Sequence, residues 1–286
     1  MRLLIVVISL IRSFDFGGLP YDAAIPGVAY STSSNFEFPN FDNPSVFSIK
    51  NDEGISLSFG YAPHGWEDIL NYGSQAKFRN LTAISFYMKG GGFSYRPLGK
   101  KKIISEDFQE EYSIDEFQIV LSDLVYYKFY GGIGLKYYYV RYSEASVENG
   151  SPHVNLDTGN GFSINVGALL DFDKVRLGFF LRNILSGIYY HDYPKDVLNL
   201  SGGSGIAVVP HNAVMISLDC IGEKEGKLVW TSGLTLKPLK WLAILTGYSF
   251  NDRCLSGGVQ INYKEGNFVI TYRKDAVFLT WRSSLK

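Results

Sequence analysis

Histidines and nucleophile or phosphate motifs are the features of a chain most able to catalyse or to bind a metal, but here their spacing supports neither role. The four histidines, His64, His153, His191 and His211, fall in separate segments, so a shared metal site would require distant loops to converge. The chain contains no G-x-S-x-G nucleophile elbow, no G-x-x-x-x-G-K-S/T phosphate loop and no H-E-x-x-H zinc helix. We therefore predict that the protein is not an enzyme and has no catalytic residue, metal site or cofactor.

Basic side chains offer a different chemistry, because they can pair with a carboxylate through charge-assisted hydrogen bonds. Lys136, Arg176, Arg182 and Lys237 stand at polar positions in segments whose other positions are apolar. If these polar positions face a common interior, the four cations line it. Two alternatives stay open, since the cations could instead solvate a water-filled lumen or pair with a carboxylate such as Asp171.

An aromatic segment before a proline turn supplies an apolar partner for such cations. Phe36, Phe38 and Phe41 precede Asn43-Pro44, which places apolar side chains beside a rigid bend. Apolar contacts next to cations suit an amphipathic anion such as a fatty acid, whose tail is buried while its carboxylate is paired. We predict that these five residues belong to a ligand-binding plug.

The four cations must be positioned by β-strands, because apolar and polar residues alternate almost everywhere after residue 54. Phe162, Ile164 and Val166, for example, share one face, and Ser163 and Asn165 share the other. The runs are about ten residues long, as transmembrane β-strands are. Fourteen strands are predicted, at about 54–62, 68–78, 81–89, 115–129, 131–144, 161–172, 174–185, 198–209, 212–220, 227–237, 241–250, 256–264, 266–274 and 276–284.

The connections distinguish a membrane barrel from a soluble β-sandwich, which would also alternate. Every second connection is short and the intervening ones are long and polar. The short ones include 79–80, 173, 210–211 and 265–266, and the long ones include 98–113, 145–160 and 186–197. Outer-membrane barrels sort turns and loops between two rims in this way. We predict an all-β fold, an antiparallel transmembrane β-barrel of about 14 strands.

Composition and charge agree with this fold. Aromatic residues make up 15% of the chain and charged residues 19%, and the net charge is −1. This composition excludes a disordered polyelectrolyte and provides no basic field for nucleic acid. Tyrosines toward the strand ends, among them Tyr126, Tyr137, Tyr138 and Tyr189, are predicted to form girdles at the membrane interfaces.

The first fifty residues do not alternate and are expected to serve other purposes. An apolar run at 3–11 follows Arg2 and is too short for a membrane helix, so residues 1–12 are predicted to be a signal peptide, with a buried first strand as the alternative. The following backbone is irregular and cannot face lipid, because its amides would be unpaired. Residues 13–50 are therefore predicted to form an N-terminal hatch or plug in the lumen, and residues 51–286 the outer-membrane β-barrel.

Several short motifs follow one another from about residue 20 to the end. Asn43-Pro44-Ser45 is followed by motifs at 55–61, 132–138, 163–170, 175–184, 233–238 and 243–248. Their content and order resemble the PorV/PorQ group of FadL-type barrels, in which the first motif is the "NPA" hatch turn. Ser45 stands where that group has alanine.

The resemblance implies a protein of the bacterial cell outer membrane, with outer-membrane lipid as its surroundings. It implies one of two roles, namely transport of hydrophobic or amphipathic small molecules, or service as an accessory or shuttle protein of an outer-membrane protein secretion system. Its partners would be a hydrophobic small molecule in the first case and secretion-system proteins in the second. A soluble, aromatic-rich β-protein that binds carbohydrate is the competing class.

Overall fold

The computed structural model describes residues 40–49, 52–61, 81–105, 108–148, 151–191, 198–222, 228–264, 266–273 and 276–285. They form one 3-10 helix, η1 (Pro44–Ile49), and fifteen strands. The strands are β1 (Gly54–Tyr61), β2 (Leu81–Met88), β3 (Gly91–Ser105), β4 (Phe108–Tyr126), β5 (Phe129–Glu148), β6 (Ser151–Asp171), β7 (Val175–Arg182), β8 (Ser186–Tyr190), β9 (Ser201–His211), β10 (Val214–Gly222), β11 (Leu228–Leu239), β12 (Leu242–Ser249), β13 (Cys254–Tyr263), β14 (Gly266–Arg273) and β15 (Ala276–Ser284). The predicted signal peptide at 1–12, the hatch before residue 40 and the strand expected at 68–78 lie outside the described residues. In the described part of the chain, no helix is long and apolar enough to cross a membrane.

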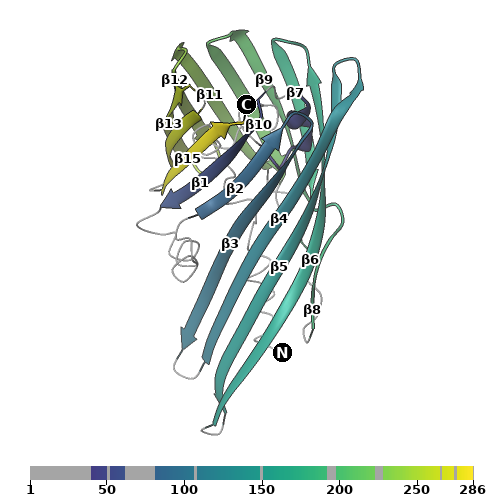
Figure 1. Ribbon diagram of the computed structural model, residues 1–286, viewed down its shortest axis with the longest axis vertical. Helices are drawn as coiled ribbons and strands as arrows, with labels where there is room; N and C mark the ends of the chain where they lie inside the picture. Colours follow the sequence, from purple (N-terminus) through teal and green to yellow (C-terminus); the bar gives the residue numbers. More distant parts are fainter. Residues whose placement is uncertain are drawn as a thin grey trace.

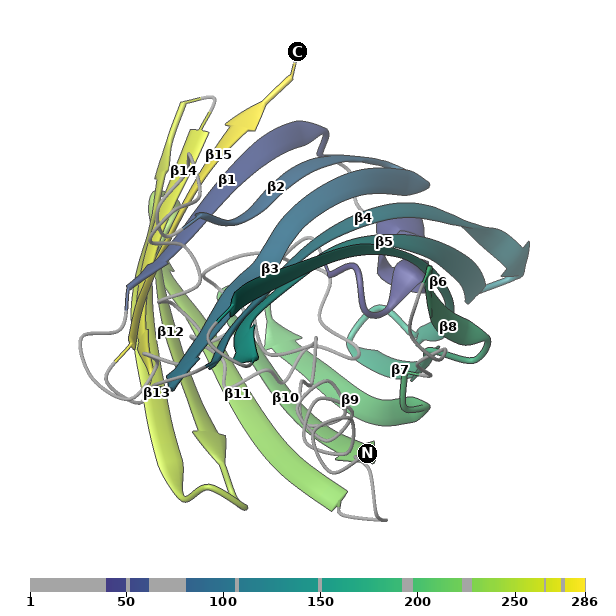
Figure 2. The same cartoon turned by 90° about the horizontal axis from the view of Figure 1, so that it is seen from below.

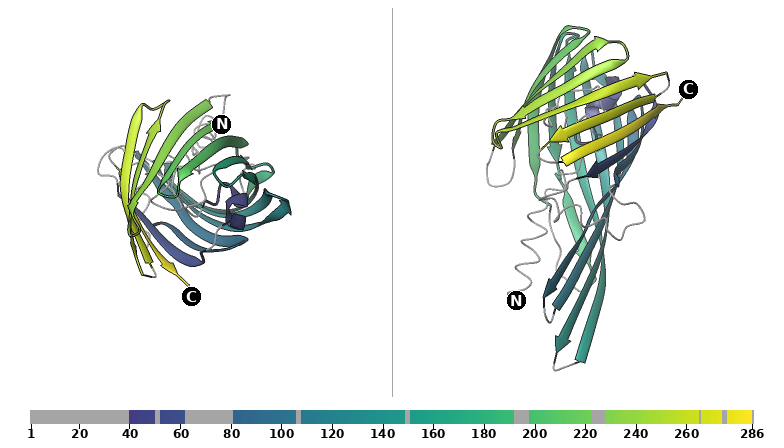
Figure 3. Two further views of the ribbon diagram at one scale, coloured as in Figure 1. Left: turned by 90° about the horizontal axis from the view of Figure 1, so that it is seen from above. Right: turned by 90° about the vertical axis from the view of Figure 1, so that its left-hand side faces the viewer.

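The strands form one antiparallel sheet that closes into a barrel, as Figures 2 and 3 show. Apart from β8, strands that follow one another in the chain are neighbours in the wall, and β1 pairs with β15 to close it. Both β7 and β8 pair with β6, since Leu181 lies opposite Val166 and Ser186 lies opposite Ser163. β8 is thus an extra strand in the line of β7, and the wall has fourteen strand positions, in agreement with the predicted fold.

The two faces of the wall differ in polarity, as the period of two predicted. Phe162 and Leu181 are exposed on the outer surface, whereas Ser163 and Asn165 are buried inside. Large apolar side chains are exposed around the whole wall, namely Phe59, Met88, Phe93, Ile119, Ile133, Phe162, Phe179, Ile206, Ile216, Trp230, Ile244, Val259, Phe268 and Trp281. A continuous apolar exterior would drive association in water, so lipid is the solvent that this surface fits.

Aromatic rings border the exposed apolar side chains of the outer surface, and an ion pair lies next to these rings. The ring centroids of Tyr95 and Phe117 lie 5.1 Å apart, and those of Phe117 and Tyr137 lie 6.3 Å apart. Next to these rings, Asp115 accepts a hydrogen bond from the Tyr95 hydroxyl and pairs with Arg141 at 3.2 Å. Aromatic rings bordered by charges are the side chains expected where a membrane meets water.

The prediction of long loops at 98–113 and 145–160 is wrong, because strands continue through these stretches. β3 and β4 pair as far as Ser105 and Phe108, and β5 and β6 pair as far as Glu148 and Ser151. The described residues of 98–113 and 145–160 therefore belong to two long hairpins, which project beyond the rest of the barrel in Figure 1. Both stretches are polar in composition, so no apolar period marked them as strands.

The stretch 186–197 was also predicted as a loop, and its first five residues form β8 instead. Residues 192–197 lie outside the described residues, as does the turn expected at 79–80. The sequence prediction also missed β3, which follows β2 after a tight turn at Lys89 and Gly90.

Short turns gather at the rim opposite the long hairpins. The connections at 127–128, 172–174 and 212–213 lie at this rim, close to turns that the sequence predicted. Lys128 donates a hydrogen bond to Asp173 at 2.7 Å, which links two adjacent turns. This hydrogen bond raises the pKa of Lys128 above its usual value.

Candidate functional site

Residues 40–49, here called the luminal segment, lie inside the barrel, where Figure 2 shows η1 beside β5 and β6. Asn43 shapes the turn, because its Oδ1 accepts hydrogen bonds from the Ser45 backbone N–H at 3.3 Å and from the Ser45 hydroxyl at 2.6 Å. Pro44 takes the first position of η1, where a fixed φ and a missing N–H are tolerated. The Ser45 hydroxyl therefore adds a side-chain hydrogen bond to the turn.

Glycines on the inner face of the wall make room for this turn. A Cβ built on Gly132 of β5 would lie 2.6 Å from both the Pro44 carbonyl carbon and the Ser45 nitrogen. A Cβ on Gly167 of β6 would overlap Asn43 Oδ1. Any other residue at these positions would push the luminal segment away, so the glycines position it.

An apolar cluster surrounds the luminal segment near the short-turn rim. Phe41, Val46 and Phe47 pack with Tyr87 of β2 and Val120 of β4, and all five are buried. The rings of Phe41 and Phe47 meet edge to face with centroids 4.9 Å apart. Phe41 is thus placed inside the barrel, whereas the predicted plug residues Phe36 and Phe38 lie outside the described residues.

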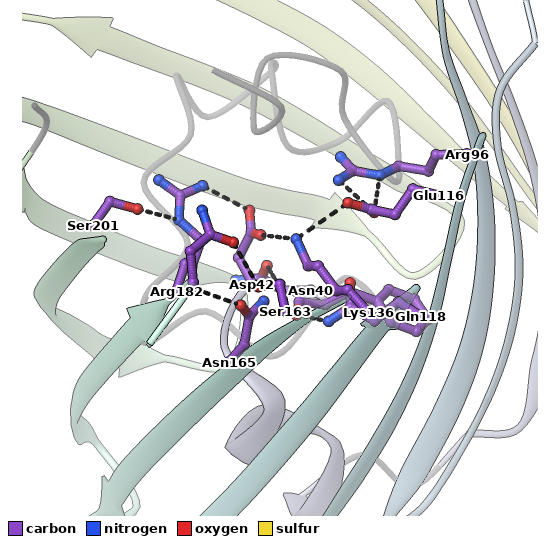
Figure 4. Close-up of polar contacts among 12 residues, drawn as sticks. Asn40, Asp42, Arg96, Glu116, Gln118, Lys136, Ser163, Asn165, Arg182 and Ser201 are labelled. Carbon is purple, nitrogen blue, oxygen red and sulfur yellow. Dashed lines mark hydrogen bonds and ion pairs between the residues drawn. The ribbon is translucent and has the colours of Figure 1, made fainter. Parts of the chain in front are cut away.

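Five charged side chains meet above this cluster, and we call Asp42, Arg96, Glu116, Lys136 and Arg182 the charge layer (Figure 4). Glu116 accepts a hydrogen bond from Arg96 Nε at 2.8 Å, and Arg96 Nη2 lies 2.6 Å from the same oxygen. Both side chains are fully buried. Lys136 Nζ lies 3.4 Å from the other Glu116 oxygen. Burial of these charges is tolerable only because each cation faces an anion.

Asp42 joins the luminal segment to this layer. Its carboxylate lies 3.4 Å from Arg182 Nη1 and 3.9 Å from Lys136 Nζ. Burial raises the pKa of Asp42. The nearby cations of Arg182, Lys136 and Arg96 lower it, and together they outweigh burial, so the pKa lies below its ordinary value of 3.8. Asp42 is therefore ionised at neutral pH and acts as an anionic anchor for the segment.

Neutral side chains complete the attachment of the segment to the wall. Gln118 Nε2 donates a hydrogen bond to the Phe41 carbonyl oxygen at 2.8 Å. Within the wall itself, Asn165 Oδ1 accepts a hydrogen bond from the Asn183 backbone N–H at 3.2 Å, and the Ser163 hydroxyl donates one to Asn183 Oδ1 at 2.7 Å. The same register brings Gln118 and Ser163 to the two sides of Lys136.

A second apolar cluster lies beyond the charge layer, toward the long hairpins. It contains the buried residues Ile114, Tyr138, Val140, Ile188 and Leu198, with Tyr190 packed against it. Tyr138 was predicted to belong to the outer girdle, but it is only 1% exposed, because it has the opposite strand parity to Tyr137. Along β5, the inner face thus changes from glycine to a cation to apolar side chains.

The interior is therefore built of three levels, an apolar cluster at the luminal segment, the charge layer and a second apolar cluster. Apolar and charged levels of this kind match the apolar and anionic parts of an amphipathic molecule. In the described part of the chain, no group of three or more His, Cys, Asp or Glu side chains could hold a metal ion.

Comparisons with known proteins bear on the fold. No family model and no curated protein matches the chain. Among solved structures, the CymD monoaromatic hydrocarbon channel is similar at a TM-score of 0.63 and 11% identity, over 96% of this chain and 99% of that one. The Pseudomonas putida toluene transporter TodX has a TM-score of 0.57 and 10% identity, over 92% and 96%. A Pseudomonas aeruginosa FadL homologue has a TM-score of 0.57 and 10% identity, over 92% and 97%.

The chain has the fold of a FadL-type barrel. This agrees with the wider part of the resemblance found in the sequence, while the narrower likeness to PorV/PorQ stays a prediction.

The cations predicted to line the lumen of this FadL-type barrel do not form one ring. Lys136 and Arg182 lie in the charge layer. Arg176 instead pairs with Asp171 at 3.0 Å beside the β6–β7 turn, and the Lys237 backbone N–H donates to Ala213 beside the β9–β10 turn. Strand parity predicted that these cations face inward, but only the register between strands determines their height along the barrel.

Three members of the charge layer were missed in the sequence. Arg96 stands between Tyr95 and Pro97 in β3, which was not recognised, and Glu116 stands between Asp115 and Phe117 at the start of a predicted strand. Their signal was a charge at an inward strand position, which is costly unless it is paired. Asp42 lies between Phe41 and Asn43 of the predicted plug, and its role became visible only once Lys136 and Arg182 were placed next to it.

Proposed function

We propose that this FadL-type barrel is a bacterial outer-membrane channel for hydrophobic or amphipathic small molecules. The observation that carries the proposal is the charge layer between two apolar clusters, inside a wall whose exterior fits lipid. The neighbours described as a monoaromatic hydrocarbon channel and a toluene transporter support the hydrophobic part of this proposal. Outer-membrane barrels have short turns on the periplasmic side and longer loops outside. In this proposal the long hairpins therefore project from the cell surface and the short turns face the periplasm.

The charges of the layer favour an anionic group on the ligand. Arg96, Lys136 and Arg182 carry three positive charges, and Asp42 and Glu116 carry two negative ones. The layer therefore has one excess positive charge in a buried place, which an added carboxylate neutralises. The apolar side chains of the second cluster provide contacts for the tail of the same molecule.

Binding of dodecanoate to the purified barrel in detergent tests this proposal. We expect saturable binding in a titration calorimeter, and we expect Arg182→Met to weaken it about tenfold, because a hydrogen bond to a charged group contributes roughly 1.5–3 kcal/mol. Arg176→Met is the matched control, since Arg176 is also an inward arginine with one carboxylate partner but lies at the short-turn rim. It should leave the affinity unchanged.

Uptake into proteoliposomes separates transport from simple binding. Vesicles that contain the barrel should take up a labelled hydrophobic substrate faster than empty vesicles, and removal of residues 13–50 should abolish selectivity. A folded barrel that neither binds dodecanoate nor speeds the uptake of any hydrophobic compound would contradict the proposal. The secretion-accessory role implied by the PorV/PorQ resemblance would then be the better explanation.

A further inference from the structure

Two neighbouring turns of the short-turn rim carry basic and aromatic side chains together. Lys240 and Trp241 connect β11 to β12, and Tyr263 and Lys264 lie at the connection from β13 to β14. Asn262 joins the two turns, because its backbone N–H donates to the Trp241 carbonyl oxygen at 2.8 Å and its Nδ2 donates to the Lys240 carbonyl oxygen at 3.3 Å. Lys240, Trp241, Tyr263 and Lys264 are all exposed, and we call these four residues the basic rim patch.

The basic rim patch borders the apolar outer surface of the barrel. Tyr263 continues the outward row of β13 that contains Val259 and Ile261, since all three residues have the same strand parity and are exposed. Lys264 Nζ lies 5.4 Å from the centroid of the Tyr263 ring, a cation–π distance. A positive charge is therefore held over an outward aromatic ring at the end of an apolar row.

A further aromatic side chain approaches the patch from β15. Trp281 is 47% exposed and lies opposite Phe268 of β14 on the outer surface. Its Nε1 would be 3.7 Å from a Cβ built on Gly266, the first residue of β14 after the turn, so the indole nitrogen is directed toward the rim. An indole N–H at this height can donate a hydrogen bond to an oxygen at the membrane interface.

The cations of the patch differ from those of another part of the same rim. Lys128 pairs with Asp173 at 2.7 Å, whereas in the described part of the chain neither Lys240 nor Lys264 has an ion-pair partner. The sequence of the two turns adds one carboxylate, Glu265, which lies outside the described residues. Two lysines and one carboxylate leave one positive charge in excess, which a single phosphodiester neutralises.

We propose that the basic rim patch binds an anionic phospholipid, with the lipid phosphate between Lys240 and Lys264. The cations stand at the end of the outward apolar row of β13, so the acyl chains of the same molecule can lie along that row, which a free phosphate has no means to use. Lysines near a membrane surface favour anionic over zwitterionic lipid. The inference requires that the barrel lies in a membrane, but it does not depend on transport of any ligand.

Native mass spectrometry of the full-length barrel, with lipid added in detergent, tests this proposal. Dioleoyl-phosphatidylglycerol should bind more tightly than dioleoyl-phosphatidylcholine, whose choline group offsets the phosphate charge. The double variant Lys240→Gln/Lys264→Gln should bind phosphatidylglycerol roughly 25-fold more weakly, about fivefold for each lysine removed. Its affinity for phosphatidylcholine should stay that of the wild type, because the apolar row and the aromatic rings are unchanged.

The double variant Lys128→Gln/Lys174→Gln is the matched control. It also removes two lysines from the short-turn rim, but these lie beside Asp171 and Asp173, so their charges are already balanced. It should keep the preference for phosphatidylglycerol. Heat-modifiable gel migration shows that each variant is folded, and the comparison of the two lipids on the wild type needs no variant.

The outcomes separate this inference from the proposed function. Equal affinity of the wild type for the two lipids, or equal losses in the two double variants, would overturn lipid binding by the patch. Glycerol phosphate that competes as strongly as the lipid would show a site for free phosphate and would likewise overturn it. A barrel that prefers phosphatidylglycerol but does not bind dodecanoate would contradict the proposed function and leave the lipid site standing.

Discussion

Replacement of Gly132 by alanine should undock the luminal segment while the barrel stays folded. The added Cβ would lie 2.6 Å from the Pro44 carbonyl carbon and the Ser45 nitrogen, whereas ordinary contact begins at 3.4 Å. Both contacted atoms are backbone atoms, so no side-chain rotation relieves the overlap, and the segment must move by about 0.8 Å. Overpacking of this kind typically costs about 1–3 kcal/mol.

The assay is hydrogen exchange of residues 40–49, because a less stable docked state exposes their amides more often. A loss of about 1–3 kcal/mol corresponds to exchange that is roughly 5 to 150 times faster. Gly131→Ala is the matched control, since the new Cβ there would meet only the Val125 Cγ2 methyl, at 3.0 Å, and that side chain can rotate. It should leave the exchange close to that of the wild type.

Equal exchange in Gly132→Ala and Gly131→Ala would refute the argument that the glycine seats the Asn43-Pro44 turn. A Gly132→Ala barrel that fails to fold would be detected by the loss of heat-modifiable gel migration. In that case Gly167→Ala, which meets Asn43 from β6, repeats the test from the neighbouring strand.

The remaining predictions concern the outer surface and the ionisation of Asp42. Ile119 is 53% exposed on the outer face of β4, and Ile119→Arg should lower the free energy of unfolding in bilayers by about 2–4 kcal/mol. Tyr126→Arg, at the rim, should lower it by only roughly 0–1 kcal/mol. Equal losses of the two variants in chemical denaturation would contradict a lipid-facing outer surface. Because the folded pKa of Asp42 lies below its ordinary value of 3.8, its contribution to docking is complete above that value and is lost as the pH falls through the folded pKa. Exchange of residues 40–49, corrected for intrinsic rates, should therefore accelerate on acidification below about pH 4 in the wild type but not in Asp42→Asn, and the same profile in both would show that Asp42 does not anchor the segment.

The class of fold was predictable from the sequence because a strand has a period of two and a membrane wall has two different solvents. Phe162 and Val166 were placed outside and Ser163 and Asn165 inside from alternation alone, and the burial pattern agrees. The Asn43-Pro44 bend was also local, since its hydrogen bonds join residues only two positions apart. Information of this kind is carried by neighbouring residues, so no tertiary structure was needed to read it.

Strands with two polar faces could not be recognised in this way. The outer parts of β3 to β6 were predicted as the loops 98–113 and 145–160, because their backbone pairing is not accompanied by an apolar period. These segments are strands because they pair with a neighbouring strand, and the composition of 98–113 or 145–160 does not indicate that partner.

The charge layer was decided by the tertiary structure alone. Alternation predicted that Lys136, Arg176, Arg182 and Lys237 face inward, but it contains no information about height, which depends on the register between strands far apart in the chain. That register puts Lys136 and Arg182 beside Asp42 and leaves Arg176 with Asp171 at the rim. Asp42 and Arg182 lie 140 residues apart in the chain, so the sequence predicted the charges but only the tertiary structure determined which of them pair.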